Sequence, residues 1–121
     1  MIKICSFFEL PIEKERIGKV LSIANSHPRN VGKIDGQVKC LMPEWEDVVA
    51  FKRHQISEEE FVKRYRELIV SRWSEVKSWM MSLGVEDELY LCCWEREGFC
   101  HRYLVAKMLK KFRSDLKIRV T

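Results

Sequence analysis

Apolar residues recur along the chain with two different spacings, and these spacings predict its secondary structure. Short runs rich in β-branched and aromatic residues predict strands over residues 2–8, 38–42 and 88–94, with a terminal edge strand over 116–120. Apolar residues three or four positions apart predict helices over residues 11–25, 45–54, 57–83 and 101–113. Strands that alternate with helices favour an α/β fold: a small single domain, residues 1–121, whose mostly parallel sheet of about four strands is flanked by helices.

The signal for a helix is strongest at Ser57. Its hydroxyl is a good helix cap, Glu60 completes the pattern of a capping box, and acidic residues fill the first turn, where the helix dipole favours them. Apolar residues then continue at helical spacing to Leu83, and Gly84 ends the segment. This pattern predicts one continuous helix of about 25 residues, or nearly 40 Å.

The segment from Ser26 to Gln37 has no apolar periodicity and predicts a loop. It is long for so small a domain, and long loops are often functional. Arg29 and Lys33 make it a candidate lid over a binding site.

Composition and charge narrow the class of protein. With 46% hydrophobic and 33% charged residues the chain is typical of globular domains, and 121 residues bury a core large enough to fold without disulfides or metal. The net charge of +4 is compatible with a nucleic-acid or phosphate partner but does not require one. No apolar run approaches the roughly 18 residues that span a bilayer, and the start of the chain lacks a secretory pattern. We therefore expect a cytoplasmic protein without a membrane partner.

The five cysteines are expected to be free thiols in a reducing compartment. Cys92 and Cys93 are neighbours on a predicted strand, so their side chains should point to opposite faces. We assign Cys5 and Cys92 to the core, where a free cysteine packs as a small hydrophobic residue.

Reactive side chains gather in one stretch, residues 89–109. Its sequence predicts a strand, a polar loop and a helix, and the chemically capable residues at the turn are Cys93, Glu95, Cys100, His101 and Arg102. In a parallel sheet, ligands bind beyond the carboxyl ends of the strands, and the start of a helix attracts anions.

The first hypothesis is therefore an anion or phosphate site for a nucleotide or nucleic acid. Arg102 and the helix start, with Cys100 and His101, would bind the anion, while Glu95 would orient Arg102 or act as an acid or base. Gly98 is the single glycine of the loop, which excludes the glycine-rich patterns of P-loops and dinucleotide sites.

The second hypothesis is a thiol-dependent enzyme. A thiol at a helix start beside a histidine and an arginine should have a lowered pKa, which makes Cys100 a candidate thiolate. Cys93 is close enough in sequence to act as a second nucleophile or redox partner, and His101 would activate the attacking thiol. The C-x6-C spacing differs from the C-x-x-C of thioredoxin-like proteins, and Phe99 stands where a cysteine phosphatase would have its arginine.

Simpler roles are the alternatives for the same residues. The loop would then only lock the strand to the helix in a structural or interaction module, with Glu95 in an ion pair with Arg102 or Arg96. A zinc site is disfavoured because Cys100 and His101 diverge by about 100° on a helix, so neither metal nor cofactor is expected. The tryptophans are assigned to the core, His27 and His54 to the surface, and the basic C-terminal helix to a solvated face or a nucleic-acid footprint.

The stretch LYLCCWEREGFCHRYLVAKML resembles the signature of a family of small prokaryotic proteins, domain of unknown function 488. In that family an apolar strand is followed by Cys-x-Glu, a short variable loop and Cys-His-Arg at a helix start. The matching residues are Cys93, Glu95, Cys100, His101 and Arg102. Upstream segments that also fit are Leu41–Pro43, Ile56–Phe61 and Arg64–Tyr65. The resemblance implies a single α/β domain with a shared site at the Cys-His-Arg loop, and it assigns no activity.

Overall fold

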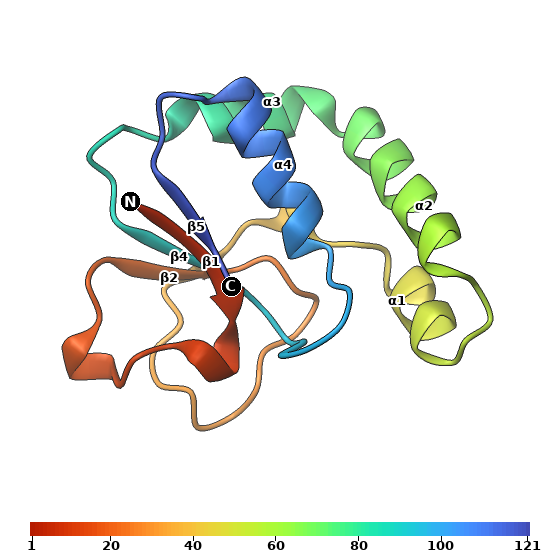
Figure 1. The fold of residues 1–121 in the computed structure, drawn as a ribbon, viewed down its shortest axis with the longest axis horizontal. Coiled ribbons are helices and arrows are strands. Elements are labelled where there is room, and N and C mark those ends of the chain that lie inside the picture. The colour runs from red at the N-terminus through yellow and green to blue at the C-terminus, as the bar shows by residue number, and fades with distance from the viewer.

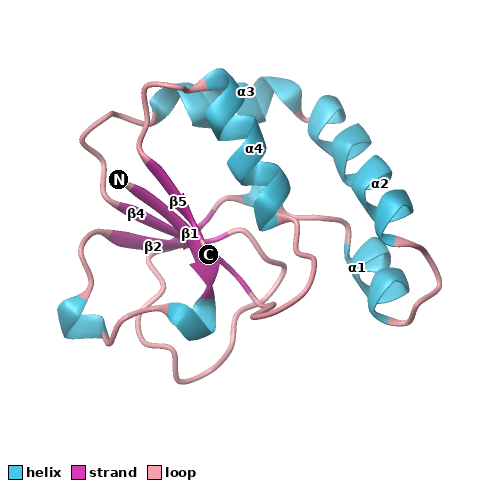
Figure 2. Cartoon of the chain, viewed as in Figure 1, coloured by secondary structure: helices cyan, strands magenta, loops and turns pink.

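A five-stranded parallel sheet in the order β3-β2-β4-β1-β5 forms the centre of the computed structural model, which describes residues 1–121 (Figures 1 and 2). Its strands are β1 Ile2–Ser6, β2 Lys19–Ser22, β3 Gly36–Gln37, β4 Leu89–Cys93 and β5 Ile118–Val120. The helices are α1 Trp45–Lys52, α2 Glu58–Ser71, α3 Trp73–Ser82 and α4 Arg102–Phe112. The predicted α/β class is confirmed, with one strand more than expected.

The central strand β4 lies between β1 and β2, which explains why its sequence is almost continuously apolar. α3 and α4 lie on one side of the sheet, and the segment that joins β1 to β2 lies on the other (Figure 1). The register pairs Cys5 with Cys92 and Ser6 with Cys93, so the two neighbouring cysteines of β4 belong to opposite faces. None of the helices combines the length and apolar character that crossing a membrane requires.

The helix predicted over residues 11–25 is wrong. This segment holds a 3-10 turn, Glu13–Glu15, and then β2. Gly18 separates them with a φ of +96°, and a Cβ at this position would lie 2.0 Å from the carbonyl oxygen of Glu88. The glycine therefore brings the chain against the start of β4, where the Lys19 amide donates to the same carbonyl.

The strand predicted over residues 38–42 is also wrong, because Lys39–Leu41 forms a 3-10 turn. Side chains from the helical layer use the carbonyls of this segment: the Tyr65 hydroxyl donates to Leu41 and the Arg72 guanidinium donates to Met42. The strand on that edge, β3, falls at the end of the predicted loop, which is otherwise confirmed from Ser26 to Asp35.

The single long helix predicted from Ser57 divides into α2 and α3 at Arg72, whose φ of −106° and ψ of 18° end the first helix. The Ser57 cap is confirmed, with the Glu60 amide donating to its hydroxyl. The predicted strands at residues 2–8, 88–94 and 116–120, and the helices at 45–54 and 101–113, are present with shorter ends.

Candidate functional site

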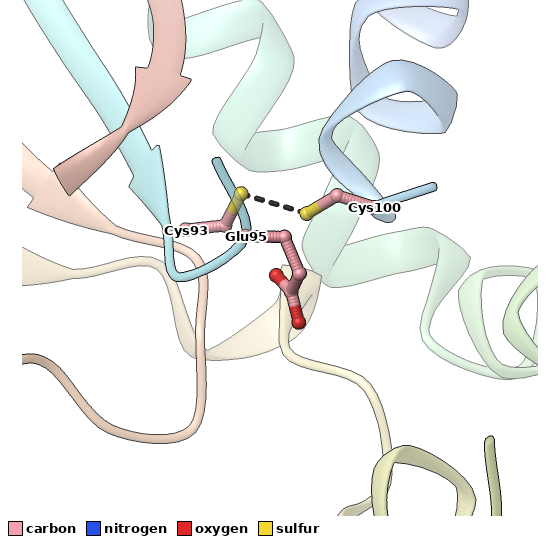
Figure 3. A group of neighbouring side chains, drawn as sticks. All are labelled: Cys93, Glu95 and Cys100. Atoms are coloured by element: carbon pink, nitrogen blue, oxygen red, sulfur yellow. Dashed lines mark hydrogen bonds between the residues drawn. The ribbon is translucent and has the colours of Figure 1, made fainter. Parts of the chain in front are cut away.

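The loop from Trp94 to His101 brings two cysteines together at the carboxyl end of β4. Cys93 is the last residue of the strand, and Cys100 comes just before α4. Gly98 has a φ of +77°, which lets this loop turn back on itself. As a result the two sulfur atoms lie 2.7 Å apart and face each other (Figure 3). We call Cys93 and Cys100 the thiol pair; all five cysteines are free.

Arg102, the first residue of α4, has none of its surface exposed. Its Nη1 donates to the Cys93 sulfur at 3.1 Å and to the Glu95 carbonyl at 2.5 Å. Its Nε donates to the Thr121 carbonyl, and Nη2 donates to the Tyr103 hydroxyl. A buried guanidinium requires a compensating anion, and no Asp or Glu side chain forms an ion pair with this one. The Cys93 sulfur, as a thiolate, is the side-chain group placed to supply negative charge.

The pKa values of the two thiols of the pair are shifted in opposite directions. The Cys100 thiol donates to the Cys93 sulfur and lowers the pKa of Cys93, and the Arg102 guanidinium lowers it further, against the opposing effect of burial. The same contact and burial raise the pKa of Cys100. The pair therefore holds one proton and one negative charge over a wider range of pH than two independent thiols would.

The lowered pKa expected at Cys100 is thus wrong, because it belongs to Cys93. Helix α4 begins only at Arg102, so Cys100 lies outside the helix, and the guanidinium reaches the sulfur of Cys93. Sequence spacing does not reveal which of two thiols an arginine will contact.

His101 lies beside the pair with 6% of its surface exposed. Its Nε2 is 2.8 Å from the carbonyl of Ile23, which can only accept a hydrogen bond. In the neutral ring this leaves Nδ1 without a proton, 3.7 Å from the Cys100 sulfur. The ring also packs against Tyr65. Ile23 and Tyr65 are both distant from His101 in the sequence, and no sequence pattern predicts these contacts.

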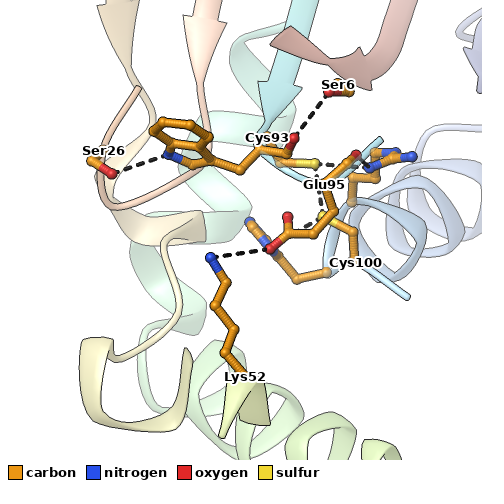
Figure 4. A network of polar contacts seen from close by, with 9 residues as sticks. Ser6, Ser26, Lys52, Cys93, Glu95 and Cys100 are labelled. Carbon is orange, nitrogen blue, oxygen red and sulfur yellow. Dashed lines mark hydrogen bonds and ion pairs between the residues drawn. The ribbon is translucent and has the colours of Figure 1, made fainter. Parts of the chain in front are cut away.

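Glu95 forms an ion pair with Lys52 of α1, with 3.8 Å between Oε1 and Nζ (Figure 4). The ion pair expected with Arg102 or Arg96 is therefore wrong, since Arg102 contacts the Glu95 main chain instead. The Glu95 side chain is 31% exposed, so this pair adds little stability and the carboxylate can change partners.

A pocket of about 260 Å³ opens in front of the thiol pair. Aromatic and aliphatic side chains from α1, α2 and the loop after β4 form most of its wall, including Trp45, Phe51 and Trp94. Its polar wall consists of Asn25, Ser26, Lys52, Glu95, Cys100 and His101. Cys93 and Arg102 are absent from the lining and lie behind Cys100.

Sequence reasoning missed several of these pocket residues. Lys52 and Ser26 lie in segments with no motif, and Trp45 is 56% exposed although it was assigned to the core. Ser26 is held in place by the indole of Trp94, which donates to its hydroxyl (Figure 4). The assignments of Cys5 and Cys92 to the core and of His27 and His54 to the surface are confirmed.

Cys93, Glu95 and Cys100 also have the chemistry of metal ligands, with ligand atoms within 4.8 Å of one another (Figure 3). Two thiolates on one tetrahedral zinc, each about 2.3 Å from the metal, lie about 3.8 Å apart. The sulfurs here are 2.7 Å apart, so they would have to separate to admit the ion. The separation is nearer to that of a disulfide bond, about 2.05 Å, than to that of two zinc ligands, so the arrangement does not fit a zinc site as it stands.

Comparison with protein families identifies the same region. The model described as the active DUF488-N3 subclade, DUF488-N3a, matches residues 5–113, which include the pocket and the thiol pair. Comparisons with curated proteins and with solved structures gave no match. The match extends over nearly the whole chain and agrees with the Cys-His-Arg signature at the start of α4. The chain therefore belongs to the DUF488 family.

Proposed function

We propose that this protein is a thiol-dependent enzyme in which Cys100 attacks an electrophilic substrate held in the pocket. The observation that supports this most is the 2.7 Å contact between Cys100 and a Cys93 sulfur that Arg102 holds at 3.1 Å. This contact and the guanidinium lower the pKa of Cys93 and so favour a negative charge on the pair, and Cys100 is its member on the pocket wall.

The residues around Cys100 provide for its proton. As the Cys100 sulfur attacks, its proton can move to the Cys93 sulfur or to Nδ1 of His101, which the Ile23 carbonyl keeps oriented. Glu95, at the pocket edge, is placed to act as acid or base toward the substrate. A reactive group activated by its neighbours next to an apolar pocket is the usual arrangement of an enzyme site.

Alkylation of the thiols as a function of pH tests this proposal. With the reduced protein and a small alkylating agent, Cys100 should react below pH 7 although its own pKa is raised, because its proton moves to the Cys93 sulfur as Cys100 attacks. Replacement of Cys93 by Ser should move this reactivity to higher pH, whereas Cys40→Ser, outside the site, should leave it unchanged. If Cys100 reacts below pH 7 no faster than a free cysteine, the proposal is wrong.

A second candidate is a site for phosphate, a nucleotide or nucleic acid. It is favoured because one pocket is lined by polar side chains and by the residue that precedes α4: Asn25, Ser26, Lys52 and His101. Lys52 and the helix start would bind the anion, because Arg102 donates to groups of the protein itself. Calorimetric titration with phosphate and a nucleotide panel tests this function. Binding that Lys52→Ala abolishes would support it, and the absence of binding would contradict it.

A further inference from the structure

We infer that the substrate of the thiol pair is a low-molecular-weight disulfide, which the pair reduces by thiol–disulfide exchange. This inference rests on the proposed function and adds the class of substrate. The two sulfurs are 2.7 Å apart in the reduced protein, and a disulfide bond is about 2.05 Å long. A shift of well under 1 Å therefore closes the bond between Cys93 and Cys100.

Both cysteines are buried, but only Cys100 borders the pocket, and this sets the order of the steps. The Cys100 sulfur attacks one sulfur of the substrate. The substrate S–S bond breaks, the other half takes up the proton that Cys100 passed to Cys93 or His101 and leaves as a thiol, and a mixed disulfide forms on Cys100. The Cys93 thiolate then attacks the Cys100 sulfur and expels the second half as a thiolate. The pair is oxidised by two electrons, and the substrate disulfide is reduced to two thiols.

Arg102 controls how far this reaction runs. In the reduced pair it faces the Cys93 thiolate, and in the oxidised pair the negative charge has left with the product. A buried cation without its anion is unfavourable, so Arg102 stabilises the reduced form relative to the disulfide. A reduced form stabilised in this way makes the pair a weaker reductant, so the exchange runs to completion only with an excess of the substrate disulfide.

The pocket limits the size and character of the substrate. A volume of about 260 Å³ suits a small molecule, and aromatic walls such as Phe51 and Trp94 make favourable contacts with sulfur. Lys52 and Glu95 place opposite charges at the same opening, which matches the carboxylate and ammonium groups of an amino-acid disulfide. Aliphatic disulfides with such groups should therefore react faster than neutral ones of similar size.

Exchange with cystine tests the inference. The full reduced chain is incubated with cystine or with the neutral bis(2-hydroxyethyl) disulfide, quenched with an alkylating agent and mapped by peptide mass spectrometry. We expect a bond between Cys93 and Cys100 with both reagents, formed faster with cystine. In Cys93→Ser the reaction should stop at a mixed disulfide on Cys100, and Cys40→Ser should behave as the unchanged protein.

Two further outcomes separate this inference from the proposed function. If Cys100 is alkylated below pH 7 but neither disulfide oxidises the pair, the substrate class is wrong and the thiol function stands. If Cys100 is inert to both kinds of reagent, both proposals fail. Arg102→Met should shift the exchange equilibrium toward the Cys93–Cys100 disulfide by about tenfold or more, because the Cys93 thiolate of the reduced pair loses its counter-ion. An unchanged equilibrium would contradict the role given to Arg102.

Discussion

Arg102 is a charged side chain with no exposed surface. Burial of its charge costs free energy of folding, and its hydrogen-bond partners offset this cost. It holds the end of β4 through Cys93 and Glu95, and it holds the end of β5 through Thr121. The anion that it binds belongs to the protein itself. The side chain that suggested a phosphate site in the sequence therefore contacts, in the structure, the sulfur of Cys93 and lowers the pKa of that thiol.

Replacement of Arg102 by Met should destabilise the protein and weaken its thiolate. Two carbonyls lose a buried donor and Cys93 loses its counter-ion, so we expect a loss of about 3 kcal/mol in the free energy of unfolding, measured in urea. Arg96→Met is the matched control, because Arg96 is exposed on the same loop and its replacement should cost less than about 0.5 kcal/mol. Equal effects of the two substitutions would contradict the assigned role.

The lowered pKa of Cys93 predicts a dependence of stability on pH. Between its pKa in the folded protein and its ordinary value of 9.0, the folded state is ionised while the unfolded state still holds the proton. The thiolate therefore stabilises the fold most fully above pH 9, and this contribution is lost as the pH falls through the folded pKa. Above pH 9 the raised pKa of Cys100 works in the opposite direction.

The measurement is the difference in unfolding free energy between the unchanged protein and Cys93→Ser, from pH 5 to pH 8.5. This difference should grow as the pH rises. The same difference for Cys40→Ser, which removes a thiol whose pKa is raised by burial, should change little over the range. A Cys93 difference that is flat with pH would show that the thiol is neutral in the folded protein.

At the scale of elements, strand β4 and helix α4 could be predicted from sequence because their apolar patterns are strong. The errors fell where a tertiary contact overrides a local pattern. Residues 11–25 have helical spacing, but Gly18 brings them against Glu88, and residues 19–22 form β2, an inner strand between β3 and β4. In the same way, the reactive residues around Cys100 could be recognised from their motif. The contacts of Lys52 with Glu95 and of Ile23 with His101 join segments distant in sequence, and no local pattern predicts them.

Two glycine substitutions test how β2 is placed. Gly18→Ala puts a Cβ 2.0 Å from the Glu88 carbonyl oxygen at a φ of +96°, so the backbone of two strands must shift. We expect a loss of more than about 3 kcal/mol. Gly98→Ala has the similar φ of +77° but nothing within 4 Å, so it should cost only about 1 kcal/mol. Chemical denaturation of both variants gives the comparison, and similar losses would mean that the contact with Glu88 is unimportant.

Across the whole molecule, the two walls of the pocket differ in how deeply their residues are buried. On one wall, Cys100 and His101 lie next to the sheet and α4, whose inner face is buried. The opposite wall comes from α1, a helix of eight residues without a single fully buried side chain. Its packing depends on half-buried residues such as Phe51, which contacts Phe61 and Phe99.

Access to Cys100 should therefore depend on local opening of α1 rather than on global unfolding. Elements with few buried contacts open at lower free energy than the core, so amide hydrogens of α1 should exchange faster than those at the centre of β4. Phe51→Ala should speed both exchange in α1 and alkylation of Cys100, while leaving the protection of β4 largely unchanged. Leu109→Ala, a core substitution on α4, should instead lower protection throughout the molecule. If Phe51→Ala speeds exchange in β4 as much as in α1, the helix opens only with the whole fold, and entry to the pocket must follow another route.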